Sequence, residues 1–391
     1  MGYFDKFFHR EERTLRIEDF MPMISSTISA ISVDGSSALK SPTTLACVRA
    51  ISETAGGLPL HVFRRQADGS RDRDSSHRAS ALLSHHANPW TSSADLRVRL
   101  VHDALIYGRG IAIATRVNGV IRELHRVDPR SVRVDIDNIE PVYRVSQKSG
   151  GEISYHYSDV VDVLTPGSTI DKPLIITREA AEAISLDIAM SRYQSNLMSR
   201  GGRPASILTS ESEKPMSPVQ LDNVLKLIQA QSSGDNSGKT IVIPDRFKFS
   251  QQTFSSVDMQ FVELMSQAKS EIMRAFRVPP TLVGDYSRAV WRNLEESAQN
   301  WLSFGLLPWL EALEFAFSRV LIDESEAGEV FLEHQVADLV RPNLAALYSS
   351  LKTATGTSFL TPNEARRAIN LPPVEGGDAL ILQAGQSSSI E

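Results

Sequence analysis

The organisation of this chain is clearest around the stretch Glu271-Ile272-Met273-Arg274-Ala275-Phe276-Arg277-Val278-Pro279-Pro280. Upstream of its end, from about Ser256 to Phe276, apolar residues recur at helical spacing and predict one long amphipathic helix. The two prolines end that helix, because proline has no amide hydrogen to continue the hydrogen-bond ladder. A loop then leads to a further helix over 292–322, which we expect to kink near Pro308.

A second long helix is predicted over 177–200, with Thr177 as its N-cap and Gly201-Gly202 as its end. Between the two helices the pattern predicts a compact α/β insertion. It would hold a strand over 205–208, a helix over 217–231, a Gly/Ser/Asn-rich loop over 232–238, and strands over 240–243 and 247–249. A helix pair with a module at its tip suits a subunit that packs beside copies of itself better than a compact monomeric enzyme.

Residues 40–165 predict an α+β domain with a largely antiparallel sheet. Ser41 followed by Pro42 is typical of a helix start, and a second helix is predicted over 94–107. Asn118-Gly119 between two apolar runs is the strongest short hairpin signal, and further strands are predicted over 132–136, 142–145, 153–157 and 160–164. Residues 1–39 have weak apolar periodicity and are predicted to form a flexible arm.

Composition excludes several classes of protein. The 391 residues are 41% hydrophobic and 23% charged, which is typical of a chain with a sizeable core. A net charge of −6 argues against binding along a nucleic-acid or membrane surface through a dominant positive field. We expect no transmembrane helix and no secretion signal. The one cysteine, Cys47, excludes an internal disulfide and is interpreted as a small buried hydrophobic residue.

No catalytic motif is present: the chain has no P-loop and no GxSxG, HExxH or EF-hand pattern. One polar cluster offers a weak alternative as a metal or hydrolase site. We favour exposed histidines beside a helix surface, because no ligand spacing repeats. The cluster consists of His85, His86, Asp95, His102 and Asp103. The sequence therefore predicts no enzyme, no cofactor and no metal site.

Six blocks in register resemble tailed-bacteriophage portal proteins. They are Thr44–Phe63, Asn88-Pro89 and Thr91 with Tyr107–Ala112, Leu124–Pro129, Arg203–Leu208, Asp258–Glu263 with Glu271–Pro280, and Thr361–Arg366 with Leu371–Asp378. Each block alone is weak, but together they cover about 40–380. The family's Gly-Asn after its first helix is Gly108-Arg109 here, and the block after the loop also departs, at Val290–Glu295.

The resemblance implies an α+β portal-type subunit with a wing, a two-helix stem, an inserted α/β clip and a small helical crown. The expected parts are an arm (1–39), wing (40–176), stem helix (177–200), clip (201–255), stem helix (256–277), tunnel loop (278–292), wing return helix and strand (293–335) and crown (336–391). About twelve such subunits would form a homo-oligomeric ring at one capsid vertex, a channel for DNA packaging and ejection.

The channel role requires no catalytic residue. The stem helix 256–277 carries Asp258, Glu263 and Glu271 against Lys269, Arg274 and Arg277, which fits a wall that does not grip DNA. We expect Arg288 or Arg292 to face the lumen and touch phosphates. Val290 and Trp291 would pack either between adjacent loops or against the return helix. The candidate channel residues are Arg277, Asp285, Arg288, Val290, Trp291 and Arg292.

The implied partners are the large terminase and later the head–tail adaptor, both at the clip, together with the major capsid protein and double-stranded DNA. No membrane is implied. The expected location is the virion, with the host cytoplasm during assembly. Two alternatives stay open: another virion ring component, such as an adaptor or baseplate protein, and a phage maturation hydrolase.

Overall fold

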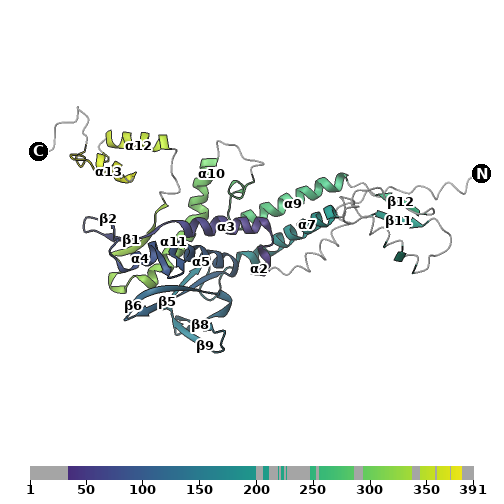
Figure 1. The fold of residues 1–391 in the computed structure, drawn as a ribbon, viewed down its shortest axis with the longest axis horizontal. Coiled ribbons are helices and arrows are strands. Elements are labelled where there is room, and N and C mark those ends of the chain that lie inside the picture. The colour runs from purple at the N-terminus through teal and green to yellow at the C-terminus, as the bar shows by residue number, and fades with distance from the viewer. Residues whose placement is uncertain are drawn as a thin grey trace, which may run out of the picture. The chain divides into compact units, whose positions relative to one another are not determined.

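The structure is a computed structural model. It describes residues 34–199, 206–210, 219, 222–223, 226, 247–251, 255–285, 294–336, 344–356, 359–369 and 371–380. The chain divides into two compact units, residues 1–333 and 334–391, and each is described by itself (Figure 1).

The first unit begins with a helical layer. It contains α2 (Gly35–Ala38), α3 (Pro42–Gly57), α4 (Arg78–Ser84) and α5 (Ser93–Tyr107). The hydroxyl oxygen of Ser41 accepts a hydrogen bond from the Thr44 amide and so caps α3, as predicted. Helix α2 lies inside the segment predicted as a flexible arm, and a capping box between Asp34 and Ser37 accounts for it. Residues 1–33 of that predicted arm lie outside the described residues.

The predicted sheet is divided into several small ones. The chain order of strands is β1 (Leu60–Arg65), β2 (Arg71–Arg73), β3 (His86–Asn88), β4 (Thr91–Ser92), β5 (Arg109–Val117), β6 (Val120–Val127), β7 (Val132–Asp137), β8 (Glu140–Ser146), β9 (Glu152–His156) and β10 (Val160–Leu164). With β13 (Val330–His334) from later in the chain, their hydrogen bonds make the sheets β13-β1-β2, β10-β5-β6, β3-β4 and β7-β8-β9. The predicted antiparallel pairing is confirmed for β5–β6, β7–β8, β8–β9 and β5–β10. The prediction that these strands form a single sheet was wrong.

The core of the first unit lies between these layers. Ile111, Tyr143 and Val160 are buried together, with side chains of β7 and β9 packed against them. On the other side, α5 packs directly on β5: a Cβ added to Gly110 would lie 2.0 Å from the Leu100 carbonyl oxygen. Figure 1 shows α3 and α5 on one side of β5 and β6, with β8 and β9 on the other. Because β5 is covered on both faces, its residues 111–114 form a continuous apolar run rather than an alternating one.

The helix predicted over 177–200 is interrupted near its start. The structure has α6 (Ile176–Glu179) and then α7 (Ala181–Ser199). Thr177 was wrongly predicted as an N-cap; its buried hydroxyl donates to the Ile106 carbonyl oxygen at 3.0 Å and ties α6 to α5. Helix α9 (Ser255–Ala275) confirms the second long helix, and it packs along α7.

Between α7 and α9 the described residues include β11 (Ser206–Ser210) and β12 (Phe247–Gln251), which pair antiparallel. These strands match the predictions near 205–208 and 247–249. Residues 219, 222–223 and 226 are helical, within the helix predicted over 217–231. The predicted loop over 232–238 and strand over 240–243 lie outside the described residues.

After α9 the chain forms α10 (Leu294–Trp301), the π-helical segment η6 (Leu302–Leu306), α11 (Leu307–Leu321) and β13 (Val330–His334). The irregularity expected near Pro308 is therefore a π turn just before it, and Pro308 occupies the first turn of α11. Strand β13 joins β1, where the rings of Phe331 and Phe63 stack at 5.8 Å. Short 3₁₀ turns are η1 (Pro129–Ser131), η2 (Tyr157–Asp159), η4 (Pro280–Val283) and η7 (Glu324–Glu326).

The second unit contains α12 (Leu344–Gly356) and α13 (Pro362–Ala368). Thr361 and Glu364 form a capping box that starts α13. The buried Asn363 amide bonds both the amide and the carbonyl of Val374 and the carboxylate of Asp378, so it fastens the following loop onto α13. In the part of the chain that the structure describes, no helix combines the length and the apolar character that a membrane span needs.

Candidate functional site

The end of α9 positions the first predicted channel residue, Arg277. The Val278 amide donates to the Met273 carbonyl at 2.9 Å, and the Arg277 amide donates to the Arg274 carbonyl at 3.1 Å. This pair of bonds is a Schellman motif, which places Arg277 in the left-handed region with φ of 55°. Glycine is the favoured residue there, since a side chain in this conformation costs roughly 1–2 kcal/mol. The Arg277 side chain is exposed.

The chain then turns back along the molecule through η4. Gly284 takes up a left-handed conformation with φ of 84°, and the Asp285 amide donates to the Pro280 carbonyl at 2.9 Å. Asp285 is therefore held at the exposed end of a closed turn. Of the six predicted channel residues, Arg277 and Asp285 are described; Arg288, Val290, Trp291 and Arg292 lie outside the described residues.

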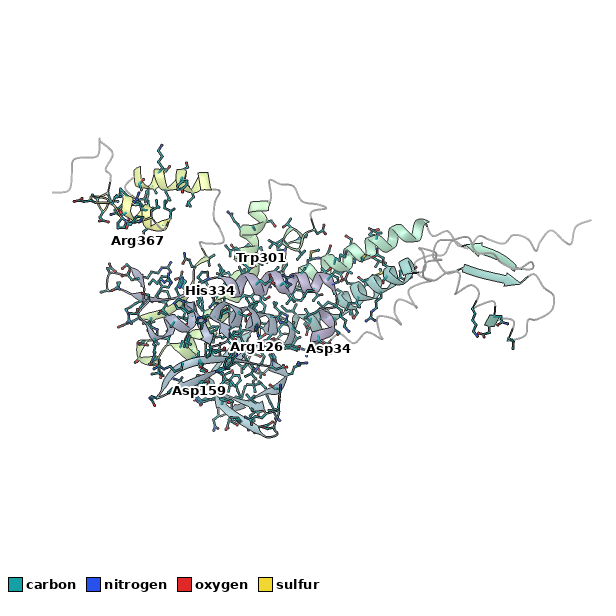
Figure 2. All side chains as sticks on the ribbon, in the orientation of Figure 1. Asp34, Arg126, Asp159, Trp301, His334 and Arg367 are labelled. Carbon is teal, nitrogen blue, oxygen red and sulfur yellow. The ribbon has the colours of Figure 1, made fainter. Side chains whose placement is uncertain are left out.

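The return helix packs tightly against the end of α9. A Cβ added to Gly305, in η6, would lie 2.6 Å from Cδ1 of Trp301 and 3.0 Å from the Arg277 carbonyl oxygen. Only glycine allows this approach. The indole of Trp301, labelled in Figure 2, is buried, and its Nε1 has no hydrogen-bond partner among the described residues. The sequence analysis did not predict this close packing of η6 on the end of α9, although a glycine within an apolar helical pattern is a signal of close packing.

A groove of about 770 Å³ lies at this joint. Its lining includes Arg274, Arg277, Pro279, Trp301 and Phe304. A second groove of about 470 Å³, on the α3 side of α9, includes Lys269 and Asp285 in its lining. The described residues around the end of α9 thus place cationic side chains beside apolar walls.

The charged side chains of α9 are of both signs, and together with Arg277 the segment 256–277 has the zero balance predicted from the sequence. Glu263, Glu271 and Arg274 are exposed, and Lys269 is half-buried. Glu271 accepts a hydrogen bond from Gln267 at 3.2 Å. This surface carries no continuous run of positive charge. The side chain of Asp258 lies outside the described residues.

A buried hydrogen bond anchors α7 to the helical layer. The hydroxyl of Ser41 donates to the carboxylate of Asp187 at 2.6 Å, and both side chains are buried. Because Ser41 also caps α3, a single side chain joins the start of α3 to the middle of α7. The sequence predicted the cap but not this contact, which joins residues far apart in the chain.

The polar cluster weighed as a metal or hydrolase site has other roles in the fold. Asp95 pairs with Arg99 at 2.9 Å, and the buried Asp103 accepts two hydrogen bonds from Arg126 at 2.6 and 2.7 Å (Figure 2). His102 Nδ1 lies 3.8 Å from Asp103. Among the residues that the structure describes, no three His, Cys, Asp or Glu side chains are grouped to hold a metal ion. Cys47 is buried as predicted, and burial raises the pKa of its thiol to about 12.

A buried polar network links α11 to the sheets. The hydroxyl of Tyr143 donates to Asp162 at 2.9 Å, and Arg109 lies 3.7 Å from the same carboxylate. Arg319 of α11 donates to the Val160 carbonyl at 2.9 Å. Burial raises the pKa of Asp162, and the positive charge of Arg109 opposes that shift. The network fixes α11 on the sheets.

The comparisons with known proteins agree with this non-catalytic site. The family model described as phage portal protein matches residues 42–370, so the chain belongs to the phage portal protein family. This family is a structural, non-enzymatic component of phage particles.

Individual relatives extend the match. The portal protein of Enterobacteria phage HK97 is 26% identical over 360 residues, covering 90% of this chain and 84% of that protein. A portal protein of the HK97 family from Corynebacterium diphtheriae shares the fold with a TM-score of 0.59 at 15% identity, covering 80% of this chain and 100% of that one. A chain in the neck of the native gene transfer agent particle, computed with C12 symmetry, has a TM-score of 0.56 at 22% identity, covering 91% and 94%.

Proposed function

We propose that this chain is the subunit of a portal ring of about twelve copies, set at one vertex of a capsid, through which double-stranded DNA is packaged and later ejected. The observation that carries the proposal is the arrangement around α7 and α9. The two helices pack side by side, and the chain between them closes its own antiparallel pair, β11–β12. This is the order expected of stem, clip and stem.

The parts of the subunit follow from that order. Residues 40–176 form the wing, 177–200 and 256–277 the stem, and 201–255 the clip. Residues 278–292 form the tunnel loop, 293–335 return to the wing, and 336–391 form the crown. The fixed attachment of α11 to the sheets through Arg319 supports the assignment of the return segment to the wing. The clip docks the large terminase during packaging and the head–tail adaptor afterwards.

The tunnel loop touches DNA weakly. The flanking stem segment 256–277 carries three acidic and three basic residues, so a moving duplex is not held along the stem. Arg288 and Arg292 exceed Asp285 by one charge per copy, and a ring repeats this excess around the channel. Arg277 stands at the base of the loop in a conformation that favours glycine, which supports a role for its side chain.

The double variant Arg288→Glu with Arg292→Glu tests this DNA role. Because it reverses two charges per copy and so changes the net charge of the loop by four units, we expect at least about a tenfold loss of packaged or retained DNA, while rings still form. Packaging is measured as nuclease-protected DNA per particle. The matched control is Arg49→Glu with Arg178→Glu, two exposed arginines on α3 and α6. Equal packaging by both double variants would contradict a DNA role for the loop arginines.

A further inference from the structure

Two hairpins of the first unit have the same turn geometry but different residues. In the β5–β6 hairpin, Asn118 and Gly119 have φ of 52° and 80°. In the β7–β8 hairpin, Asn138 and Ile139 have φ of 46° and 81°. These values are typical of a two-residue type I′ turn, which strongly favours glycine at its second position. Ile139 is therefore a β-branched residue in a conformation that such residues rarely adopt.

The residue pairs that close the two turns also favour the β5–β6 hairpin and disfavour the β7–β8 hairpin. Val117 faces Val120 across the β5–β6 turn, an apolar pair that stabilises a hairpin. Asp137 faces Glu140 across the β7–β8 turn, where two like charges directly opposite each other destabilise it. The carboxylate of Glu140 lies 3.5 Å from Nε2 of His156, and this ring carries an opposite charge only when it is protonated.

No packing contact among the described residues explains these choices. The Ile139 side chain is 94% exposed, and its neighbour on the same hairpin, Ile136, is 55% exposed. Packing within the subunit therefore does not offset the strained backbone at Ile139. Backbone strain without an internal reason points to a contact outside the chain. The tip consists of Ile136, Asp137, Asn138, Ile139 and Glu140, and we call it the rim tip.

The proposed function tells which way the rim tip faces. In the first unit, Figure 1 shows α10 above α3 and α5, and β8 and β9 below them. If residues between α9 and α10 line the channel, the β7–β8–β9 sheet lies on the side away from the ring axis. On a ring set into a capsid vertex, that side faces the surrounding shell.

We propose that the rim tip docks the ring in its shell: Ile139 enters an apolar recess of the shell protein, bordered by basic side chains that face Asp137 and Glu140. This inference rests on the proposed function. The aliphatic side chain supplies the buried anchor and the two carboxylates supply charge complementarity. One small contact per copy is sufficient, because a ring presents many tips to the shell at once.

The experiment coexpresses the full chain with the major capsid protein of the same virus, and counts by electron microscopy the fraction of shells that carry a ring. The test variant is Ile139→Asn, because asparagine accepts the left-handed conformation. Its melting temperature should stay the same or rise, its rings should form normally, and ring-bearing shells should fall at least about tenfold. Ile139→Val keeps an apolar anchor and should behave as the wild type. Val117→Thr removes a half-exposed aliphatic residue from the other hairpin and should have no effect.

Two results would overturn the inference, and a third would overturn the proposed function on which it rests. Unchanged shell occupancy with Ile139→Asn means that the side chain makes no shell contact. Loss of rings by the isolated variant means that the tip contacts a second copy of this chain instead. If the wild-type chain forms neither rings nor ring-bearing shells, the proposed function itself fails. The variant Asp137→Asn with Glu140→Gln provides an independent check, since it should also lower occupancy and make it less sensitive to salt.

Discussion

The helical layer of the first unit and the rim tip use unfavourable residues in opposite ways. Arg97 lies in the interior, 3% exposed, and its guanidinium donates to the carbonyls of Gly56, Leu83 and Leu58 at 2.9–3.1 Å. It satisfies the ends of α3 and α4 with one side chain. The side chain of Ile139, in contrast, is 94% exposed and so gains almost no stabilisation from packing against the described residues. The fold therefore explains the buried charge of Arg97, but it does not explain the left-handed isoleucine at the rim tip. For this reason we assign Ile139 to a contact with a partner.

Replacing Arg97 tests the interior half of this comparison and has the largest expected effect. Burial lowers the pKa of Arg97 to about 10, so the group is still charged at neutral pH. Arg97→Met keeps the volume but leaves three buried carbonyl groups without a donor. We expect a loss of about 3–5 kcal/mol in the free energy of unfolding, measured by urea denaturation.

The control for Arg97 is Arg49→Met. Arg49 is exposed and pairs with Glu53 one helical turn away at 2.7 Å, and a solvent-exposed pair of this type adds little to stability. Similar losses for the two variants would show that the carbonyl contacts of Arg97 do not stabilise the helix ends.

Exchanging residues between the two hairpins sharpens the comparison at the rim. Gly119→Ile places in the β5–β6 turn the residue that the β7–β8 turn tolerates. We expect a loss of roughly 1–2 kcal/mol, because the left-handed conformation is retained and no contact compensates for it. The measurement is the shift in thermal unfolding of the isolated chain. Gly119→Asn is the matched control and should cost only a few tenths of a kcal/mol.

A stability-neutral Gly119→Ile would contradict the premise that Ile139 is strained. In that case the isoleucine at the rim tip would need no external explanation, and the docking proposal would lose its main support.

Much of the fold could be predicted from local sequence signals. Ser41-Pro42 predicted the start of α3, and Asn118-Gly119 predicted the β5–β6 turn, because in both cases the residues that stabilise the structure are adjacent in sequence. Contacts between distant segments could not be predicted. The pairing of β13 with β1 and the contact of Ser41 with Asp187 depend on how the chain folds back on itself.

The candidate site was predicted only in part. The prolines marked the end of α9, but the left-handed Arg277 was not foreseen, because an arginine gives no sequence signal for that conformation. Arg97 is charged and therefore resembled a surface residue, although it is buried. The prediction of a single sheet was wrong because the sequence pattern of a strand does not show which other strand it pairs with.

The central claim is that copies of this chain assemble into a ring, and the most direct test is electron microscopy of the purified full-length protein with native mass spectrometry of the same sample. The account predicts closed rings of about twelve subunits with a central channel, and a mass peak for the same assembly. A chain that remains a monomer or dimer at high concentration, and that also forms no ring when coexpressed with its capsid protein, would contradict it.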